Sequence, residues 1–446
     1  MSVIAERNIV GIVDSGGRGA ALARAYERSP HVDGIVVIPG NDLTAEMATK
    51  PTFVFPNISN SSADAIADKF SELGVTLADV AQDNAIEAGV TDRLREQGIA
   101  TIGPSRDAGQ IEWSKAYARG LGKNAGLQQP RFETFTRIEP ADWYIDHSGE
   151  ENFVVKANGL AEGKGVKLAH SSEEAKRMVR LLHEQHAKAS EIFLIEEMVA
   201  GEEFSTFFAS DGEHIKLLGH AQDHKREGNY DTGENTGGMG ASTPPRLMTR
   251  TVELVVEQEV KKMMTALSEE GRPYEGIGYY GGMLNEVLKR VNNIEWNARW
   301  GDPEVEIVAP GITSDIFELA VAIVKKSLDK YTLTTDNLAR VVVAGASRGY
   351  PRDYSMVKGK EVFGLDYVMH MEGVELYGAG VKVDEDGRHW ANGGRLFYIV
   401  GQGENVIEAR EKAYGAMARV HVDGNNLMYR NDIGWKDVQR LRDEGY

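Results

Sequence analysis

The N-terminal part of the chain alternates short apolar runs with helix-forming runs, and this alternation limits the fold more than any other feature. Apolar runs occupy residues 9–13, 34–38 and 99–102, and helical patterns occupy residues 20–26, 62–73 and 84–97. Runs of this kind bounded by turns are typical of buried strands. Strands separated by helices predict a parallel sheet covered on both faces, and therefore an α/β domain.

Glycine-containing turns follow the first two predicted strands. Residues 14–19 are Asp-Ser-Gly-Gly-Arg-Gly, and residues 39–41 are Pro-Gly-Asn. Ligands of parallel sheets bind at the carboxyl ends of the strands, where a helix N-terminus offers backbone N–H groups to a phosphate. We therefore expect a phosphate site at the first turn, with the second turn beside it. The glycine spacing differs from the dinucleotide fingerprint, which argues against NAD.

The composition excludes several classes of protein. The chain has 446 residues, a formal net charge of -18 and no cysteine. The length predicts about three domains. The lack of cysteine excludes disulfides and thiolate chemistry, and the negative charge argues against nucleic acid as a partner. The sequence has no apolar stretch long enough to span a bilayer, so we expect no membrane partner and a cytoplasmic location.

Residues 294–304, Ile-Glu-Trp-Asn-Ala-Arg-Trp-Gly-Asp-Pro-Glu, combine a strand pattern with polar chemistry. At the strand period of two, Glu295, Asn297 and Arg299 share one face, and the apolar residues between them share the other. A carboxylate and an amide oxygen suit Mg²⁺, which is usually shared with substrate phosphates. The arginine can hold a phosphoryl or carboxylate group. The alternative is an edge strand with a solvated polar face.

A second glycine-rich loop follows a strand that ends in Lys156. Residues 157–166 contain three glycines and Lys164, which predicts a mobile loop that closes over a polyphosphate between two lysines. The apolar strand of residues 191–198 ends in Glu196 and Glu197, which are candidates to accept hydrogen bonds from adenine and ribose. The alternatives are a solvated hairpin and acids that serve solubility.

The polar segment of residues 220–240 is too glycine-rich to build core and too long for a simple turn. These properties indicate a functional loop whose backbone N–H groups can form an anion nest. A helix predicted over residues 249–270 leads to a strand at 278–284. We expect this strand to pair with the polar strand at 291–298.

We predict three domains with distinct architectures. A parallel-sheet α/β substrate domain covers residues 1–106, and a two-lobed domain covers residues 107–335, with its smaller lobe at about 125–195. A small β-rich domain covers residues 336–446, where short strands alternate with Gly or Asp turns.

A series of motifs spans nearly the whole chain. They are Pro39–Asn41, Gly103–Ser105, Glu112 with Ser114 and Lys115, Val154–Gly165, Ile195–Glu197, Gly201–Ser205, Gln222–Arg226, Asn235–Ala241, Glu295–Glu304, Gly349–Pro351, Asn392–Arg395 and Arg430–Gly434. In this order they resemble the ATP-grasp superfamily and, within it, the phosphoribosylamine–glycine ligase family. The resemblance implies a pre-ATP-grasp domain, a two-lobed ATP-grasp domain and a β-rich C-terminal domain.

The resemblance also implies an activity: ATP-dependent ligation of glycine to phosphoribosylamine through a glycyl phosphate, which gives glycinamide ribonucleotide in purine biosynthesis. It implies ATP and Mg²⁺ as cofactors, with Mn²⁺ as the alternative ion, in a monomer or weak homo-oligomer. The implied nucleotide contacts are Lys115, Lys156, Gly163, Lys164, Glu196, Glu197 and Glu203, and the implied metal ligands are Glu295 and Asn297. The implied catalytic residues are Arg299, Lys225 and Asp302. The implied substrate contacts are Gly16, Gly17, Arg18, Asn41, Asp223, Asn235, Thr236, Gly237 and Gly238.

Two N-terminal segments depart from the family pattern. Gly16–Leu22 lacks an acid and an imidazole that the family carries, and Ala81–Ile86 replaces Gly-Pro-Glu-Ala-Pro-Leu, with Asp83 as a partial substitute for the glutamate. The resemblance assigns both segments to the amine acceptor. Two alternatives therefore stay open, a ligase of this superfamily with a different amine and a non-catalytic nucleotide-binding homologue. Glu234 replaces a family proline, and the sequence offers no physical reason for it.

Overall fold

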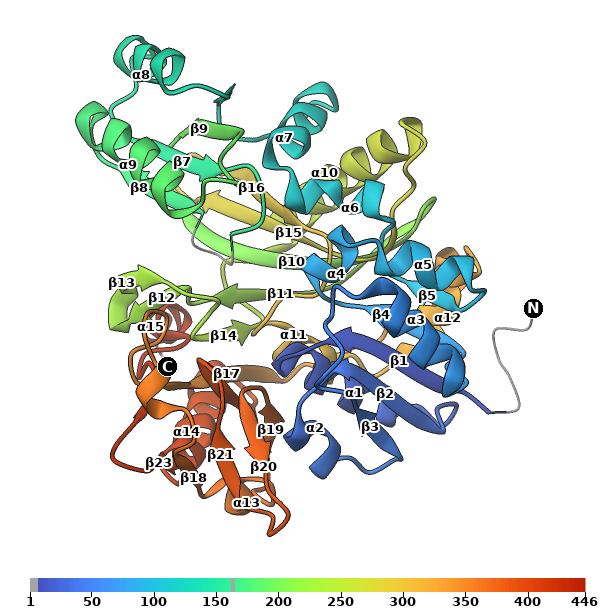
Figure 1. Ribbon diagram of the computed structural model, residues 1–446. Coiled ribbons are helices and arrows are strands. Elements are labelled where there is room, and N and C mark those ends of the chain that lie inside the picture. Colours follow the sequence, from blue (N-terminus) through green and yellow to red (C-terminus); the bar gives the residue numbers. More distant parts are fainter. Residues whose placement is uncertain (1–6, 162–164, 446) are drawn as a thin grey trace.

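The computed structural model describes residues 7–161 and 165–445, and its N-terminal part is a parallel sheet (Figure 1). In spatial order the strands are β3 (Thr52–Val54), β2 (Gly34–Pro39), β1 (Ile9–Asp14), β4 (Leu77–Val80) and β5 (Ala100–Ile102). The helices between them are α1 (Gly17–Glu27), α2 (Asp42–Glu46), α3 (Ala63–Glu72), α4 (Asp83–Glu87) and α5 (Val90–Glu96). The predicted α/β class is confirmed, and the ends of β1 and β2 lie side by side because Asp14 pairs with Pro39.

The helix predicted over 84–97 is divided into two. It is α4 followed by α5, because Gly89 between them has a left-handed φ of 78°. A second pair of consecutive helices, α6 (Arg106–Trp113) and α7 (Lys115–Asn124), meets at Ser114. The backbone of Ser114 is extended there, and its side chain caps α7 by accepting a hydrogen bond from the Tyr117 N–H. This break places Lys115 at the first position of α7.

A small antiparallel sheet forms the next part of the chain. Its strands, in spatial order, are β6 (Phe132–Phe135), β9 (Phe193–Glu197), β7 (Phe153–Ala157) and β8 (Val166–Ala169), and its helices are α8 (Ile138–His147) and α9 (Ser172–Gln185). Their buried apolar side chains form a separate core. Figure 1 shows this unit above the large sheet, with β7 and β9 facing β16.

A long antiparallel sheet runs through the centre of the molecule. Its main path is β16 (Arg290–Asn297), β15 (Glu275–Asn285), β10 (Glu202–Asp211), β11 (Ile215–Asp223), β14 (Gly240–Thr243), β17 (Ala339–Ser347), β22 (Arg395–Gly403) and β19 (Val374–Gly378). The predicted pairing of the strands at 278–284 and 291–298 is confirmed, with Tyr280 opposite Trp296. Because β14 pairs with β17, this sheet continues across residue 336, where we predict a domain limit.

The remaining elements flank this sheet. β12 (Arg226–Gly228) and β13 (Thr232–Asn235) form a hairpin, and β20 (Val381–Val383), β21 (His389–Ala391), β18 (Glu361–Phe363) and β23 (His421–Val422) form a small sheet, while β24 (Leu427–Met428) pairs with β17. The helices are α10 (Arg250–Glu269), α11 (Val305–Val308), α12 (Ile316–Val324), α13 (Leu365–Val368), α14 (Val406–Met417) and α15 (Trp435–Asp443).

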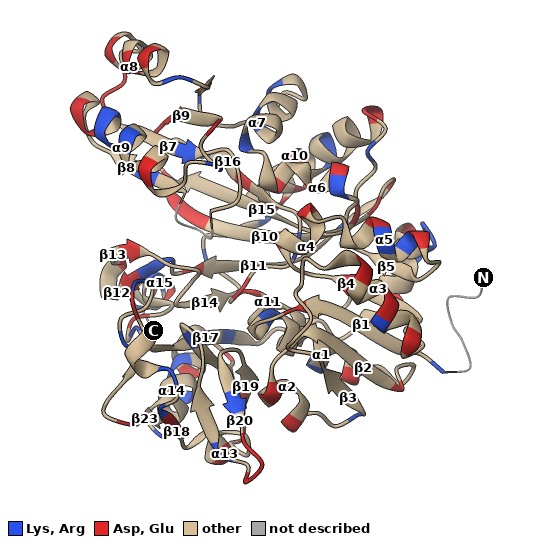
Figure 2. Cartoon of the chain, in the orientation of Figure 1, with Lys and Arg blue, Asp and Glu red and all other residues tan. Residues whose placement is uncertain are grey.

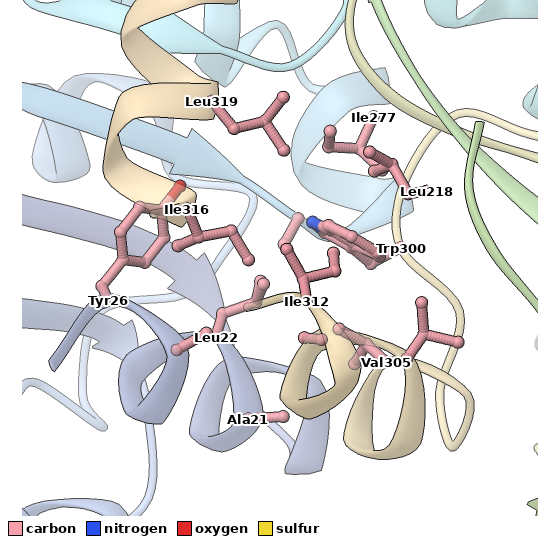
Figure 3. Packing of buried hydrophobic residues seen from close by; sticks show 14 of the residues in the cluster. Ala21, Leu22, Tyr26, Leu218, Ile277, Trp300, Val305, Ile312, Ile316 and Leu319 are labelled. Atoms are coloured by element: carbon pink, nitrogen blue, oxygen red, sulfur yellow. The ribbon is translucent and has the colours of Figure 1, made fainter. Parts of the chain in front are cut away.

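The largest apolar core joins parts of the chain that are distant in sequence. It combines α1, the centre of the long sheet, α11 and α12. Figure 3 shows the Trp300 side chain beside Leu218 of β11 and Ile312, with Leu22 of α1 nearby. The N-terminal sheet is therefore packed onto the long sheet through a shared core.

Basic and acidic residues are mixed along all parts of the chain (Figure 2). Among the helices of the described residues, none has both the length and the apolar character needed to cross a membrane.

Candidate active site

Strand β16 presents one polar and one apolar face, as its sequence predicts. Trp296 and Ala298 are buried in the core beneath α10 and α6. Glu295 and Asn297 lie on the other face, toward the small sheet, because successive side chains of a strand alternate. The Glu112 carboxylate of α6 accepts a 2.7 Å hydrogen bond from the Ala298 N–H, which fixes the end of the strand.

Glu295 carries a stabilised negative charge. Its Oε1 accepts hydrogen bonds from the Lys225 ammonium at 3.1 Å and from the Tyr279 hydroxyl at 3.2 Å. Burial raises the pKa of Glu295, but the charges of Lys225 and Lys156 outweigh burial and bring that pKa to about 2. The carboxylate is therefore ionised at neutral pH.

Arg299 connects the polar strand to its surroundings. It donates to Asn297 Oδ1 at 3.2 Å and forms a 3.0 Å ion pair with Glu112. Burial lowers the pKa of Arg299, but Glu112 and the other nearby acids together outweigh burial, so the net shift of this pKa is upward. The Trp300 carbonyl accepts from Arg299 at 3.1 Å and also from Arg18 at 3.0 Å, which links this strand to the N-terminal glycine turn.

Glu196 lies at the centre of a buried network between the two sheets. It accepts two hydrogen bonds from Arg119, at 2.8 and 3.0 Å, and forms a 2.8 Å ion pair with Lys156. Burial raises the pKa of Glu196, but Arg119 and Lys156 bring it down to about 2. Lys156 also donates to the Ile294 carbonyl at 3.0 Å, so its ammonium lies directly beside the polar strand.

Arg119 is a functional-site residue that the sequence reasoning missed. Besides Glu196, it donates to the carbonyls of Asn293 and Ile294 at 3.0 and 2.7 Å. The sequence offered one sign of its role: Arg119 lies between Ala118 and Leu121, on the buried side of α7, where a charged residue needs a partner.

Other acids expected around the nucleotide form ion pairs, some with partly buried and some with exposed partners. Lys225 bridges Glu295 and Glu203, with a 3.0 Å ion pair to Glu203. Burial lowers the pKa of Lys225, but these two carboxylates raise it well above its ordinary value. Glu197 pairs at 2.7 Å with Arg131, whose side chain is largely exposed.

Lys115 is the remaining described lysine of this group. Burial lowers its pKa, and Glu295 is the first of several carboxylates that oppose the shift. Its placement on the first turn of α7 sets its ammonium among the same carboxylates as Lys156. Gly163 and Lys164, which we also expect at the nucleotide, lie outside the described residues.

The N-terminal glycine turn is occupied by a side chain of its own. Asp14 Oδ1 accepts from the N–H groups of Gly16 and Gly19 at 2.7 and 2.9 Å, and Asp14 Oδ2 accepts from Arg18 at 2.6 Å. The expectation that this turn offers its N–H groups to a phosphate is therefore wrong for Gly16 and Gly19. The physical reason is that a carboxylate from the end of β1 already satisfies them.

Asn41 is fully engaged in holding α2. Its Oδ1 accepts from the Thr44 N–H and hydroxyl, and its Nδ2 donates to the Gly378 carbonyl at 3.1 Å. The residue thus joins the N-terminal sheet to β19, beside the glycine turn.

Asp302 and the glycine segment after β13 meet at Arg395. Asp302 Oδ1 forms a 3.0 Å ion pair with Arg395 and accepts a 2.7 Å hydrogen bond from the Tyr398 hydroxyl. Arg395 also donates to the carbonyls of Gly237 and Gly238 at 2.6 and 3.3 Å. Sequence reasoning did not commit to Arg395 or Tyr398. The signal for Arg395 was its position at the start of a strand after two glycines.

Thr236 and Asn235 shape the same segment. The Thr236 hydroxyl donates to the Lys225 carbonyl at 2.9 Å and accepts from the Gly238 N–H at 2.9 Å. Asn235 ends β13 and pairs with Arg226 of β12. The segment is thereby closed against Lys225.

Buried acids lie around Asp302, Arg395 and the glycine segment after β13. Burial raises the pKa values of Asp223 and Glu306 well above their ordinary range, and nearby carboxylates, Glu304 and Asp302 respectively, add to the shift. Asp223 Oδ1 and both carboxylate oxygens of Glu306 lack a hydrogen-bond partner among the described residues. Sequence reasoning missed Glu306, which lies two residues after the Glu295–Glu304 motif and carries no other local signal.

One of the two segments that depart from the family pattern, Ala81–Ile86, contacts the residue that precedes the other. Gln82 Oε1 accepts from the Ser15 N–H at 3.1 Å and from the Ser15 hydroxyl at 3.3 Å. Glu234, which the sequence left unexplained, forms a 3.2 Å ion pair with Arg352, and Arg352 also pairs with Glu227 at 3.1 Å.

The donor set at β16 fits a divalent cation. The hydrogen bonds that Glu295 accepts both fall on Oε1, which leaves Oε2 directed away from them. Asn297 is mostly buried, and its Oδ1, the oxygen that would face the cation, accepts a 3.2 Å hydrogen bond from Arg299. An ionised carboxylate and an amide oxygen on one strand face are ligands that a hard cation prefers.

Comparison with known families covers most of the chain. The N domain of phosphoribosylglycinamide synthetase matches residues 8–112, its ATP-grasp (A) domain matches residues 113–305, and its C domain matches residues 340–436. Curated relatives with the name phosphoribosylamine–glycine ligase include those of Escherichia coli K12, 35% identical, and Streptococcus suis, 36% identical. Each alignment covers 96% of this chain and at least 98% of the relative.

Solved structures agree with this assignment. The Thermotoga maritima phosphoribosylamine–glycine ligase superposes with a TM-score of 0.79 at 28% identity, over 95% of this chain and 100% of the other. The biotin carboxylase domain of Hydrogenobacter thermophilus 2-oxoglutarate carboxylase has a TM-score of 0.73 at 16% identity, covering 94% and 91% of the two chains, which shows a shared fold. The resemblance drawn from the sequence motifs is thus confirmed: the chain belongs to the phosphoribosylglycinamide synthetase family of ATP-grasp carbon–nitrogen ligases.

Proposed function

We propose that this chain ligates glycine to 5-phosphoribosylamine with ATP, giving glycinamide ribonucleotide, ADP and phosphate, and that the residues around Glu295 hold the nucleotide. The observation that carries the proposal is the position of the Lys156 ammonium, 3.0 Å from the Ile294 carbonyl and beside the Glu295 carboxylate. This arrangement sets cations from the small sheet opposite metal-binding oxygens of the large sheet. A triphosphate that lies between the sheets meets both.

The reaction proceeds in two balanced steps. An oxygen of the glycine carboxylate attacks the γ-phosphorus of ATP, so that a carboxylate–phosphorus bond forms, the bond to the β-phosphate bridge breaks, and ADP leaves. The amine of phosphoribosylamine then attacks the carbonyl carbon of the acyl phosphate, loses a proton and expels phosphate, which leaves the amide. Phosphoryl transfer of this kind depends mainly on positioning and charge neutralisation.

The described side chains divide this work. Lys156 and Lys115 orient the phosphates, and Arg299, held by Glu112, neutralises charge that develops on the transferred group. Lys225 pairs with Glu203 and Glu295, and it lies between the nucleotide residues around Glu295 and the glycine segment at Gly237 and Gly238. Asp302, with Arg395 and Tyr398, fixes the glycine segment at Gly237 and Gly238 on the acceptor side.

Glu295 and Asn297 would hold the divalent cation, which supplies charge stabilisation to the phosphates when bound. We infer Mg²⁺ as this ion, with Mn²⁺ as the alternative, because both prefer oxygen ligands. The remaining site residues of the prediction are part of the same proposal, apart from a phosphate contact of the Gly16 N–H group. So are the domain limits at residues 106 and 335, a cytoplasmic location and a monomer or weak homo-oligomer.

An ADP-release assay with an amine panel tests the function. With ATP and Mg²⁺ present, we expect ADP release only when both glycine and phosphoribosylamine are added. Equal turnover with another amine would instead support a changed acceptor, in line with the departures from the family pattern at Gly16–Leu22 and Ala81–Ile86. Turnover in the absence of glycine would reject the ligase mechanism.

A further inference from the structure

A histidine and two carboxylates converge where the N-terminal sheet meets the C-terminal part of the chain. Glu46 ends α2, Asp366 lies on α13 and His389 lies on β21. One donor atom from each lies within 4.8 Å of the other two, and His389 Nε2 is 2.8 Å from Glu46 Oε2. Figure 1 shows α2, β20, β21 and α13 together at the lower end of the molecule.

The three donors stand on elements that are held in place by other contacts, α13 by its buried Leu365 and Val368. His389 is buried, and its strand pairs with β18 on one side and β20 on the other. The α2 helix is tied to the C-terminal part by Asn41, which donates to the Gly378 carbonyl, and by Asp42, which accepts from the Val383 N–H at 3.2 Å. The donors therefore keep their spacing without a bound ligand, as a preorganised site requires.

The charges of this cluster are not balanced by a permanent cation. Within residues 7–161 and 165–445, no Lys or Arg forms an ion pair with Glu46 or Asp366. The basic group of the cluster is the His389 imidazole, whose Nε2 lies 2.8 Å from Glu46 Oε2. Even a protonated imidazole leaves one negative charge, so a bound cation would be favoured there.

We propose that Glu46, Asp366 and His389 bind a borderline transition-metal ion, Zn²⁺ in the first place, as a clasp between the N-terminal and C-terminal parts. An imidazole nitrogen with two carboxylate oxygens is a ligand set that Zn²⁺ accepts, whereas Mg²⁺ prefers oxygen ligands. Glu46 and Asp366 lie at the surface, so water can complete the coordination. The site is separate from the oxygen ligands Glu295 and Asn297, and the inference does not depend on the proposed function.

A second cluster of similar composition is a weaker candidate and a useful control. His31, Asp315 and Glu318 also bring donor atoms within 4.8 Å. Asp315, however, uses Oδ1 to cap α12 at Phe317 and Oδ2 to accept from the Ser29 hydroxyl at 2.8 Å. The His31 side chain is also 42% exposed, so this cluster lacks a buried, directed imidazole.

Zinc binding to the full chain, stripped of metal and held in saturating Mg²⁺, tests the proposal. Isothermal titration with ZnCl₂ is expected to show a single tight equivalent for the wild type, and zinc is expected to raise the thermal unfolding midpoint. Glu46→Gln and His389→Gln are expected to weaken zinc binding at least about 10-fold. His31→Gln is expected to bind zinc as the wild type does.

Two results would overturn the clasp: a wild-type midpoint that zinc leaves unchanged, or zinc affinity in Glu46→Gln equal to that of the wild type. Glu46→Gln is the decisive variant because residue 46 lies at the surface and the amide keeps the size of the carboxylate. Substitution by cobalt gives a second readout, since the visible d–d absorption expected in the wild type should be lost in Glu46→Gln. ADP release with glycine and phosphoribosylamine should be the same in Glu46→Gln and the wild type, which separates this test from that of the ligase.

Discussion

At the scale of single residues, the site depends on carboxylates that remain ionised although they are buried. Glu295 and Glu196 each have a pKa of about 2, because neighbouring lysines and an arginine outweigh the cost of burial. A buried charge is tolerated only when it is paired and hydrogen-bonded. Removal of either carboxylate should therefore leave buried cations without one of their partners, and it should change stability or ADP release.

Glu295→Gln should remove the anionic metal ligand while the side chain keeps its size. Loss of an outer partner of a metal ligand already costs about 10–100-fold in affinity or activity, so loss of the ligand itself should lower ADP release at least about 100-fold. Raising the Mg²⁺ concentration should recover part of the rate. The matched control is Glu286→Gln on the exposed hairpin of the same strand pair, which should leave the rate unchanged. A Glu295→Gln enzyme with normal turnover would contradict the metal assignment.

Glu196 should make stability depend on pH in the acidic range. Its folded pKa of about 2 lies below the ordinary 4.5, so its contribution is complete above pH 4.5 and is lost as the pH falls toward 2. Glu196→Gln should lower the thermal midpoint at pH 7, because Arg119 and Lys156 lose their partner, and this difference from the wild type should shrink between pH 4.5 and 2. Glu197→Gln, whose partner Arg131 is 71% exposed, should change the midpoint little. A difference that stays constant over this pH range would exclude an ionised Glu196.

At the scale of elements, the start of α1 lies against β22 and α11 without room for a side chain. A Cβ on Gly17 would lie 2.1 Å from Tyr398 Cε2 and 2.7 Å from Glu306 Oε1. The close approach brings the glycine turn to the Asp302 and Arg395 pair. It explains in steric terms why the turn needs glycine although a carboxylate occupies its N–H groups.

Gly17→Ala should separate these elements. We expect overpacking to lower the free energy of unfolding by about 1–3 kcal/mol. We also expect the KM for the amine to rise more, relative to the wild type, than the KM for ATP. Gly415→Ala in α14 is the matched control, because a Cβ there meets no atom within 4 Å and alanine favours a helix. Equal changes in both KM values would show that the glycine turn does not serve the amine side.

At the scale of the whole molecule, one apolar core makes the N-terminal sheet, the long sheet and α12 depend on one another. Trp300 is 2% exposed within this core, and its ring centroid lies 5.7 Å from that of Phe207. The N-terminal sheet, the long sheet and α12 should therefore unfold together.

Trp300→Ala should destabilise the N-terminal and central parts together. Truncation of a large buried aromatic costs about 3–5 kcal/mol, and the shared core should keep the unfolding of these parts in a single calorimetric transition at lower temperature. Trp143→Ala, at a side chain that is largely exposed, should leave the transition in place. A shift confined to one part of the heat-capacity trace would show that the N-terminal sheet unfolds independently.

The sequence alone determined the features that depend on local period and on ordered motifs. The N-terminal strand and helix order, the polar face of Glu295 and Asn297 and the pairing of strands at 278–284 and 291–298 follow from side-chain alternation and short connections. The family followed from motifs along nearly the whole chain. Only the tertiary structure decided which charges meet. Arg119 and Glu196 are 77 residues apart, and Tyr398 and Asp302 are 96 apart, so neither pair leaves a local pattern. Asp14 fills the glycine turn through local hydrogen bonds, two to five residues along the chain, and these depend on the shape of the turn, which the period of the apolar residues does not encode.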